Sequence, residues 1–499
     1  MGSQAKRPHL ILFNPDQWRG DALGHLGHPA VQTPNLDRLV GEDAVSFRNA
    51  FCQNPVCTPS RCSFMSGWYP HVRGHRTMFH MMKPDEPVLL KHLKDAGYYV
   101  WWGGKNDLVP QDNVAQYCNH KNTPSMPCKP MYAMDRLDEW RGGPDSDGYR
   151  SLFAGKLESE PAEADFSCYP DSDWGHIRDA LRFLAEAPAD QPFCLYLPLV
   201  YPHPPYGVEE PWYSLTDRRA LPPRIRPDEN WGRKPSMVRE LRSIYGLAHW
   251  EEERWDELRA TYFGMCARVD YQLGLLIQAL KQHGLYEDTA LFVFSDHGDF
   301  NGDYDLVEKT QNTFEDCLTR VPFIVKPPAW IDSRPGVSDA LVELVDLPAT
   351  VADITGLPLA YTQFGKSLVP LLSGREQEHR DAVFSEGGRL REEQHCMDST
   401  PQNNRVEDLY WPRGHLHRSS GPEHTKATMC RTKSYKYVRR LYEDDELYDL
   451  KRDPQELVNV AGDPAYREPL AQLKERMLRF YQETSDAVPW QRDQRDAAK

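Results

Sequence analysis

The segment NPVCTPSRCSFMSG, residues 54–67, places a cysteine, a proline and an arginine within five residues at an expected helix start. Thr58 and Pro59 predict the cap and the first position of the helix, so Cys57 would lie at the positive end of the helix dipole. Arg61 lies one turn further on and would reach back toward Cys57. Both positive charges should lower the pKa of the thiol and favour a thiolate nucleophile.

Three interpretations of Cys57 compete: a buried structural thiol, a metal ligand, or a side chain that becomes something other than cysteine. A cysteine near a helix start is most often an inert packing residue, because free cysteine behaves as a small apolar side chain. The residues nearest in the sequence do not supply a cysteine–histidine pair. Other segments must therefore decide between the three.

Three potential metal ligands follow two apolar runs that predict strands. LILFNPDQW places Asp16 after the first run, and LFVFSDHGD places Asp296 and His297 after the second. Open α/β sheets bind their ligands at the carboxyl ends of the strands, so we expect these side chains to meet at one edge. Two carboxylates and an imidazole would form an oxygen-rich site for a divalent cation.

The elements that position these residues alternate between short apolar runs and helical patterns through the first three quarters of the chain. Strands are predicted at residues 9–14, 98–102, 193–200, 290–295 and 322–326. One helix should begin after a capping Thr33, and a longer one should run from about Leu258 to Gly284. The predicted fold class is α/β, a large mostly parallel sheet sandwiched by helices, with a smaller C-terminal α+β subdomain.

Several stretches break this alternation. Residues 140–175 and 202–235 are rich in proline or glycine, so both are expected to be long surface loops that wall a binding site. The C-terminal part should hold a polar loop, a strand and a final helix at residues 385–425, 434–439 and 464–483. The predicted domains are a catalytic α/β domain over residues 1–380 and an α+β subdomain with a small antiparallel sheet over residues 381–499.

Composition limits the partners and the compartment. The chain has 499 residues, 40% of them apolar, so it can bury a large core. Its formal net charge of −15 argues against nucleic acid and anionic membranes as partners, because the mean field repels polyanions. Eleven cysteines without metal-ligand spacing fit a reducing compartment. The apolar run before Asn14 is too short for a signal peptide, so we expect a cytoplasmic protein.

Segments in a shared order over most of the chain resemble type I, formylglycine-dependent sulfatases of the alkaline phosphatase superfamily. Cys57-Thr58-Pro59-Ser60-Arg61 matches their C-x-P-x-R signature. The other matching segments are TPNLDRL, GGKND, YPHPPY, SDHGDFNGDYDLVEK, RVPFIVKPP and ELYDLKRDPQELVNVA. The resemblance implies an alkaline phosphatase-like fold, with similarity to the arylsulfatase and phosphonate monoester hydrolase branch.

The resemblance also implies a nucleophile and a cofactor. A maturation enzyme would oxidise Cys57 to formylglycine, whose hydrated aldehyde attacks the sulfur of a sulfate ester. Asp16, Asp296 and His297 would hold a divalent metal together with residue 57. Gln17 stands where many relatives carry a second aspartate, so the site is less negative. Calcium is the first choice, and manganese is the alternative because of His297.

Further site residues follow from the same resemblance. Arg61 would favour deprotonation of the nucleophile, and Lys105 and Lys309 match the sulfate-binding lysines of the family. His203 matches the residue that contacts sulfate and helps to protonate the leaving oxygen. Asp107 stands where relatives often have histidine, so either protonation falls more heavily on His203 or Asp107 contacts a substrate group.

Two other groups of side chains are candidates for the substrate pocket. VRGHRTMFHMM offers His75, Arg76 and His80, of which His80 is the candidate substrate-binding residue. Trp101 and Trp102 lie close to Lys105 in the sequence, although a tryptophan pair at the end of a strand is more often part of the core. The prediction therefore extends the substrate site beyond the sulfate-binding residues.

Two rival functions stay open. A phosphonate monoester or phosphodiester hydrolase of the same superfamily would share the nucleophile and metal set, but such relatives typically lack the lysine at position 105. A non-catalytic protein would bind a sulfated ligand with Cys57 unmodified. The expected partners are a small sulfated substrate, either a sulfated carbohydrate or an organic or aryl sulfate, and a formylglycine-generating enzyme. The C-terminal region could also support a homo-oligomer.

Overall fold

The computed structural model describes residues 7–129, 151–163, 166–188, 190–226, 233–398, 408, 410–419 and 421–490. One large sheet has the strand order β12-β2-β11-β10-β1-β8-β3-β4, and β11 is the strand that runs against its described neighbours. Its strands are β1 (His9–Asn14), β2 (Val45–Phe51), β3 (Tyr99–Trp102), β4 (His120–Lys121), β8 (Phe193–Pro198), β10 (Thr289–Phe294), β11 (Phe323–Lys326) and β12 (Gly336–Glu343). The predicted α/β fold class is confirmed.

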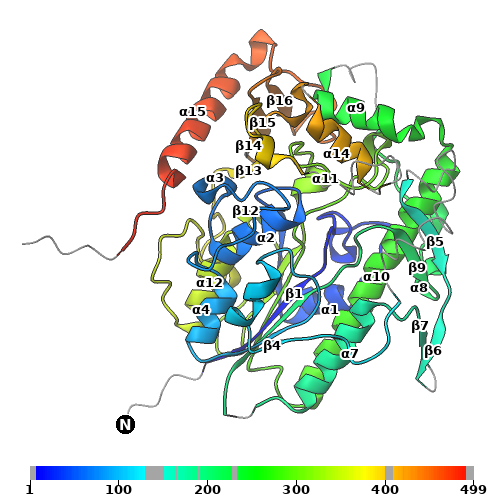
Figure 1. Cartoon of the computed structure of the whole chain (residues 1–499), viewed down its shortest axis with the longest axis vertical. Helices are drawn as coiled ribbons and strands as arrows, with labels where there is room; N and C mark the ends of the chain where they lie inside the picture. Colours follow the sequence, from blue (N-terminus) through cyan, green and yellow to red (C-terminus); the bar gives the residue numbers. More distant parts are fainter. Residues whose placement is uncertain are drawn as a thin grey trace, which may run out of the picture.

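Helices cover both faces of this sheet (Figure 1). Successive side chains of a strand point to opposite faces, so Ile11 and Phe13 join one core while Leu10 and Leu12 join another. The first core is covered by α1 (Pro34–Glu42), α7 (Ser172–Ala185) and α10 (Glu252–Gln282). The second is covered by α2 (Cys57–Ser66), α4 (Leu89–Asp95) and α12 (Asp346–Thr355). The sheet is therefore the middle layer of a sandwich.

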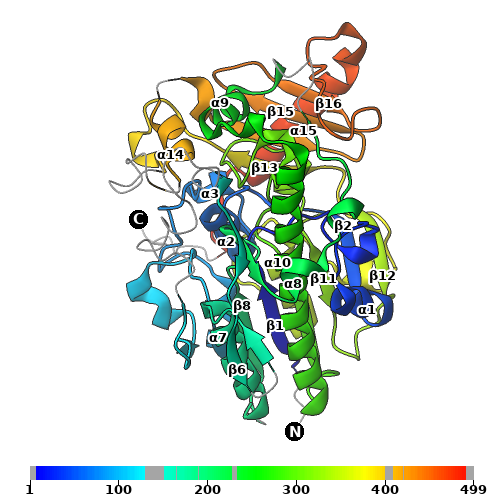
Figure 2. The ribbon, with the colours of Figure 1, turned by 90° about the vertical axis from the view of Figure 1, so that its right-hand side faces the viewer.

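A second, antiparallel sheet lies at one end of the molecule (Figure 2). Its strands are β13 (Val383–Gly387), β14 (Ala427–Arg431), β15 (Tyr435–Arg440) and β16 (Glu446–Asp449). The helix α15 (Arg467–Thr484) packs Leu473, Met477 and Phe480 against it. The predicted small C-terminal sheet and final helix are thus present, while the boundary at residue 380 stays a prediction.

Phe480→Ala is expected to lower the free energy of unfolding by about 3–5 kcal/mol, because it removes a buried aromatic ring. The Phe480 ring stacks on Phe384 with centroids 3.9 Å apart and meets Tyr69 edge-on at 4.7 Å. Leu478 lies on the same helix and is 55% exposed, so Leu478→Ala is the matched control. Denaturant unfolding measures both, and equal losses would contradict the packing described.

The prediction that residues 140–175 and 202–235 are simple loops is wrong. β5 (Phe153–Leu157) pairs with β9 (Tyr206–Glu209), and β6 (Glu160–Glu163) pairs with β7 (Phe166–Cys168). The β5–β9 pair joins segments about fifty residues apart, a pairing that local composition does not signal, while β6 and β7 are neighbours in the chain. Residues 140–150, 164–165 and 227–232 of the two predicted loops lie outside the described residues.

The predicted polar loop over residues 385–425 is also wrong. It begins inside β13 and contains α14 (Trp411–Arg418), while residues 399–407, 409 and 420 lie outside the described part. The remaining described helices are α3 (Pro70–Arg73), α8 (Trp212–Leu215), α9 (Ser236–Tyr245), α11 (Asp316–Thr319) and α13 (Val369–Leu372). Within the described ranges, no helix has both the length and the apolar character needed to cross a membrane.

Candidate active site

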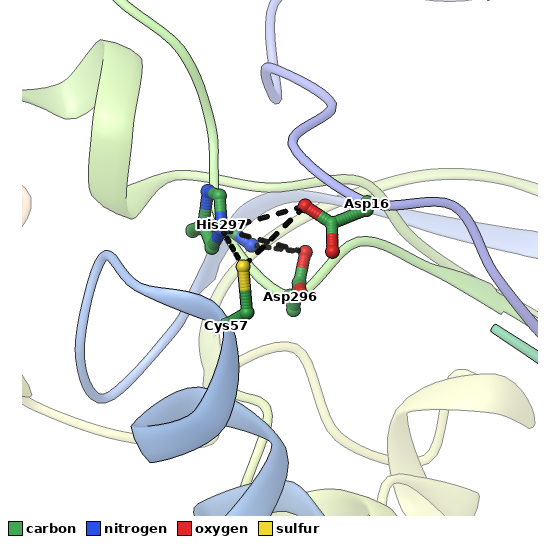
Figure 3. Close-up of side chains that lie close together, drawn as sticks. All are labelled: Asp16, Cys57, Asp296 and His297. Atoms are coloured by element: carbon green, nitrogen blue, oxygen red, sulfur yellow. Dashed lines mark hydrogen bonds and ion pairs between the residues drawn. The ribbon is translucent and has the colours of Figure 1, made fainter. Parts of the chain in front are cut away.

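Four side chains from three elements converge at the carboxyl edge of the large sheet (Figure 3). Asp16 follows β1, and Asp296 and His297 follow β10. β1 and β10 are parallel neighbours, so their carboxyl ends lie side by side. Cys57 joins them from the start of α2, and one ligand atom from each residue lies within 4.8 Å of the others. All four side chains are buried.

The start of α2 lies two residues before the predicted one. The helix begins at Cys57 itself, and Val56 takes the N-cap position in an extended conformation. The Thr58 hydroxyl has no hydrogen-bond partner among the described residues and lies inside the helix, so Thr58 does not cap it. The Ser60 hydroxyl instead donates to the carbonyl oxygen of Asp296 at 2.6 Å, which ties α2 to the end of β10. All ten residues of α2 are buried.

The Cys57 thiol is held by charged and polar neighbours. Its Sγ lies 3.2 Å from His297 Nε2 and 3.7 Å from Asp16 Oδ1, while Lys105 Nζ donates to it at 3.5 Å. Burial and the negative charge of Asp16 outweigh the lysine and raise the pKa of the thiol to about 12. The predicted lowering of this pKa is therefore wrong, because the expectation ignored desolvation and the carboxylates.

Arg61 bridges the two carboxylates. Its Nε donates to Asp296 Oδ2 at 3.0 Å and its Nη2 donates to Asp16 Oδ2 at 2.8 Å. The guanidinium therefore binds these oxygens, whereas the prediction directed it to the Cys57 thiol. Burial alone would raise the pKa of Asp16, but Lys105, His203 and Arg61 hold it well below its usual range. Asp16 is therefore ionised at neutral pH.

The donor set fits a divalent cation. His297 Nδ1 donates to the carbonyl of Gly298 at 2.9 Å, so Nε2 is the nitrogen left facing Cys57 and Asp16. Burial lowers the pKa of His297, which keeps the imidazole neutral. A neutral imidazole and an ionised carboxylate are the protonation states that metal binding requires. Carboxylate oxygens are ligands of hard divalent cations, whereas an imidazole nitrogen is typical of transition-metal sites.

Gln17 lies in the same site in a left-handed conformation, with φ of 69°. Its backbone N–H donates to Asp296 Oδ1 at 3.1 Å. Its side-chain oxygen accepts from Lys309 Nζ at 2.7 Å, and its amide nitrogen donates to Asp299 Oδ2 at 2.5 Å. Gln17 thus links a lysine to an acid, and its role as a metal ligand stays a prediction.

The two lysines and the histidine named from the sequence surround this group. Lys105 Nζ lies 2.8 Å from Asp16 and 2.9 Å from Asp107, so Asp107 is paired with the lysine. Lys309 Nζ lies 2.8 Å from His203 Nε2. His203 Nδ1 donates to the carbonyl of Pro204 at 2.6 Å, so Nε2 is the acceptor for the lysine. Burial and then Lys309 lower the pKa of His203 well below its usual range.

The predicted extension of the substrate site is wrong for the two tryptophans and stays a prediction for the other residues. Trp101 and Trp102 are buried in the two cores on opposite faces of the sheet, which makes both structural. The side chains of His75, Arg76 and His80 each contact a polar neighbour of their own. Those neighbours are Glu86, Glu393 and Thr77, respectively. The role of His80 in binding substrate stays a prediction.

Tyr206, Asp299 and the backbone of Glu308 also support the site, and none of them was assigned a role from the sequence. The Tyr206 hydroxyl donates to Asp299 at 2.9 Å and accepts from the Glu308 backbone at 2.9 Å. Burial raises the pKa of Asp299 to about 7. Asp299 follows Asp296 by three residues in SDHGD, and Tyr206 ends YPHPPY, so both lie in segments already singled out.

Known protein families and individual proteins match most of this chain. Residues 8–357 match the sulfatase family model, and residues 398–483 match the model of the N-sulphoglucosamine sulphohydrolase C-terminal region. An arylsulfatase from Clostridium perfringens is 22% identical over 499 residues, covering 95% of this chain and 94% of that protein. The multifunctional alkaline phosphatase superfamily protein PehA of Trinickia caryophylli is 25% identical, covering 92% of both.

A solved structure shows the same fold. The phosphonate monoester hydrolase of Agrobacterium radiobacter superposes with a TM-score of 0.73 at 23% identity, covering 97% of this chain and 100% of that one. At this identity the likeness concerns the fold, whereas the sulfatase model spans well over half of the chain. The chain belongs to the sulfatase family of the alkaline phosphatase superfamily.

Proposed function

We propose that this sulfatase-family hydrolase cleaves its sulfate ester with an oxygen nucleophile at residue 57, produced by oxidation of Cys57 to formylglycine. The observation that carries the proposal is the surroundings of residue 57. Two carboxylates and an imidazole that can hold a metal lie against Cys57, and Lys105 contacts its Sγ. Such a site can bind a tetrahedral anion at the nucleophile.

Each neighbour of residue 57 has a task in this reaction. A divalent cation held by Asp16, Asp296, His297 and residue 57, calcium or else manganese, would act as a Lewis acid when bound. Arg61 neutralises the two carboxylates that it bridges. Lys105 and Lys309 would bind the nonbridging sulfate oxygens, whose negative charge grows as the ester bond breaks.

The leaving alcohol needs a proton. When the sulfur–oxygen ester bond breaks, its electron pair stays on the alcohol oxygen, and a proton from His203 Nε2 would neutralise it. Lys309 contacts this nitrogen at 2.8 Å and can return a proton to it. Asp107 would keep Lys105 in place through their ion pair.

The substrate class is a sulfated carbohydrate or a small organic or aryl sulfate. The named activities of similar proteins support this range, since they include an arylsulfatase and a choline-sulfatase. Their identities to this chain, 22% and 26%, do not select one ester.

Mass spectrometry tests the nucleophile. In protein produced with a formylglycine-generating enzyme, the tryptic peptide of residues 49–61 should carry oxygen in place of the Cys57 sulfur and should react with an aldehyde-specific hydrazide. Cys52 lies in the same peptide and serves as the internal control, because it should remain a thiol. An active enzyme whose peptide is fully thiol would overturn the proposal and favour a sulfate-binding or thiol-based function.

A comparison of two substrates tests the rival function, phosphonate monoester hydrolysis. The solved structure of similar fold is a phosphonate monoester hydrolase. We expect kcat/KM for 4-nitrophenyl sulfate to exceed that for a phenyl phosphonate monoester by at least about tenfold. The reason is Lys105, which the resemblance to sulfatases matches to a sulfate-binding lysine and which lies 3.5 Å from Cys57 Sγ. A preference for the phosphonate of the same size would reverse the assignment.

A further inference from the structure

A group of four basic side chains lies outside the residues assigned above. Arg413 and His417 are four residues apart on α14 and therefore share one face of that helix. Arg389 donates a terminal N–H to the His417 carbonyl at 3.0 Å, and its backbone N–H donates to the His424 carbonyl at 2.9 Å. These contacts draw three segments together into what we call the α14 basic cluster: Arg389, Arg413, His417 and His424.

The polar atoms of the α14 basic cluster are buried without being satisfied. The four residues are between 1% and 7% exposed. Both ring nitrogens of His417 and of His424, Nε of Arg389 and Nη1 of Arg413 have no hydrogen-bond partner in the described part of the chain. A buried polar atom without a hydrogen bond costs free energy because it has lost its contact with water. A bound ligand that accepts hydrogen bonds would offset that cost.

The charge of the α14 basic cluster selects the kind of group. Arg413 forms an ion pair at 3.6 Å with Glu308, which also pairs with Lys309 at 3.0 Å. The Arg389 guanidinium donates to the backbone carbonyls of Leu390, Arg391 and His417. Two arginines and two imidazole N–H groups therefore present donors with an excess of positive charge, which suits an oxyanion and repels a metal cation.

Other acidic residues near the α14 basic cluster form their hydrogen bonds and ion pairs with residues outside it. Glu393 pairs with Arg76 at 2.7 Å, and Glu423 accepts from the Ser419 hydroxyl at 2.8 Å. Asp398 accepts from the Gln311 amide at 2.6 Å. Burial alone would lower the pKa of Arg413, but the charges of Glu308 and Asp398 raise it, so these two carboxylates offset part of the positive charge of the cluster.

The α14 basic cluster lies near the sulfate-binding residues. The ion pairs run from Arg413 through Glu308 to Lys309, so a single carboxylate separates the two groups of cations. Tyr410, just before α14, is close enough to the site for Lys105 and Cys57 to influence its pKa. In both views α14 lies at the same end of the molecule as α9 and the four-stranded sheet (Figures 1 and 2).

We propose that Arg389, Arg413, His417 and His424 form a subsite for a second anionic group of the substrate, a carboxylate or a further sulfate, beside Glu308. Calling this group part of the substrate rests on the proposed sulfatase function. The substrate class narrows accordingly to sulfate esters that carry two negative groups, as sulfated uronic acids and disulfated sugars do.

Binding can be tested without turnover. Crystals of the full chain soaked in sodium selenate should show an anomalous peak within hydrogen-bond distance of Arg413 and His417. The same soak of a His417→Gln variant should show a weaker peak or none there. If selenate occupies the site at Cys57 and leaves the α14 basic cluster empty in the wild type, the subsite proposal is wrong.

Kinetics tests the role in substrate choice. For glucosamine-2-N,6-O-disulfate and for a sulfated uronic acid, His417→Gln and Arg413→Gln should lower kcat/KM by about 10- to 100-fold, since each removes a hydrogen bond to a charged group. For 4-nitrophenyl sulfate and N-acetylglucosamine 6-sulfate the change should stay within about threefold. A larger loss on the uronic acid than on the disulfate would identify the second group as a carboxylate, and the reverse as a sulfate.

His415→Gln is the matched control, because His415 is exposed on the same helix two residues before His417. It should leave all four substrates unaffected. Equal losses on singly and doubly charged substrates in the His417 variant would show a merely structural role. Wild-type enzyme that hydrolyses none of these esters while selenate still binds the cluster would refute the proposed function and leave the anion site standing.

Discussion

Cys57→Ala is expected to reduce sulfate release by at least about 10³-fold, because it removes the atom that becomes the nucleophile while the binding residues stay in place. Its neighbours Asp16, His297 and Lys105 contact Cys57 through the Sγ atom alone. Alanine removes that atom with little change in volume. The measurement is kcat/KM for 4-nitrophenyl sulfate with enzyme produced alongside a formylglycine-generating enzyme.

Cys62→Ala provides the control for this experiment. Cys62 lies on the same helix and is 1% exposed, but it packs in the second of the two cores of the large sheet. We expect its kcat/KM to stay within about threefold of the wild type, with a small loss of stability. Retention of more than about a tenth of the activity by Cys57→Ala would show that residue 57 does not form the reacting bond.

His203→Gln is expected to act on one kind of leaving group. For a sugar sulfate, whose alkoxide is a poor leaving group, kcat should fall by about 10²- to 10⁴-fold, the usual effect of a lost general acid. For 4-nitrophenyl sulfate the fall should be less than about tenfold, because nitrophenolate departs without a proton. The ratio of the two losses is the measurement.

The resting state of His203 adds a condition to this result. Burial and Lys309 keep the imidazole neutral, and its Nε2 accepts from the lysine. A negatively charged ester beside the ring would raise its pKa and let Nε2 carry the proton. Equal losses on both esters would move the proton-donor role to Lys309, and Lys309→Arg, which keeps the charge, would then be the next variant to measure.

The edge of the sheet and the residues on it were predictable because the signals were local. β1 and β10 contain the apolar runs LILF and ALFVF, which are buried along their length, so the acids that follow them were expected to meet at one edge. β2 was missed because VSFRNAF contains Arg48 and Asn49. Arg48 pairs with Asp339, a residue of the neighbouring β12, so its polarity reflects a tertiary contact.

The electrostatics and the C-terminal contribution could not be predicted in the same way. The pKa of Cys57 depends on burial and on Asp16, which lies 41 residues away in the chain. The α14 segment, WPRGHLHR, has Pro and Gly within a single turn and no apolar period, so it resembled a loop. The helix α9 packs against it, a tertiary contact that no local pattern reports.

The burial of α2 sets an order of events during biosynthesis. Cys57 is 2% exposed, and every residue of its helix is enclosed. A second protein large enough to oxidise the side chain cannot reach it in the finished fold, so on the proposed function the oxidation has to happen while the chain is still being made or is still open. Chains that close first would stay permanently in the thiol form, and the active fraction of a preparation would reflect a race between folding and modification.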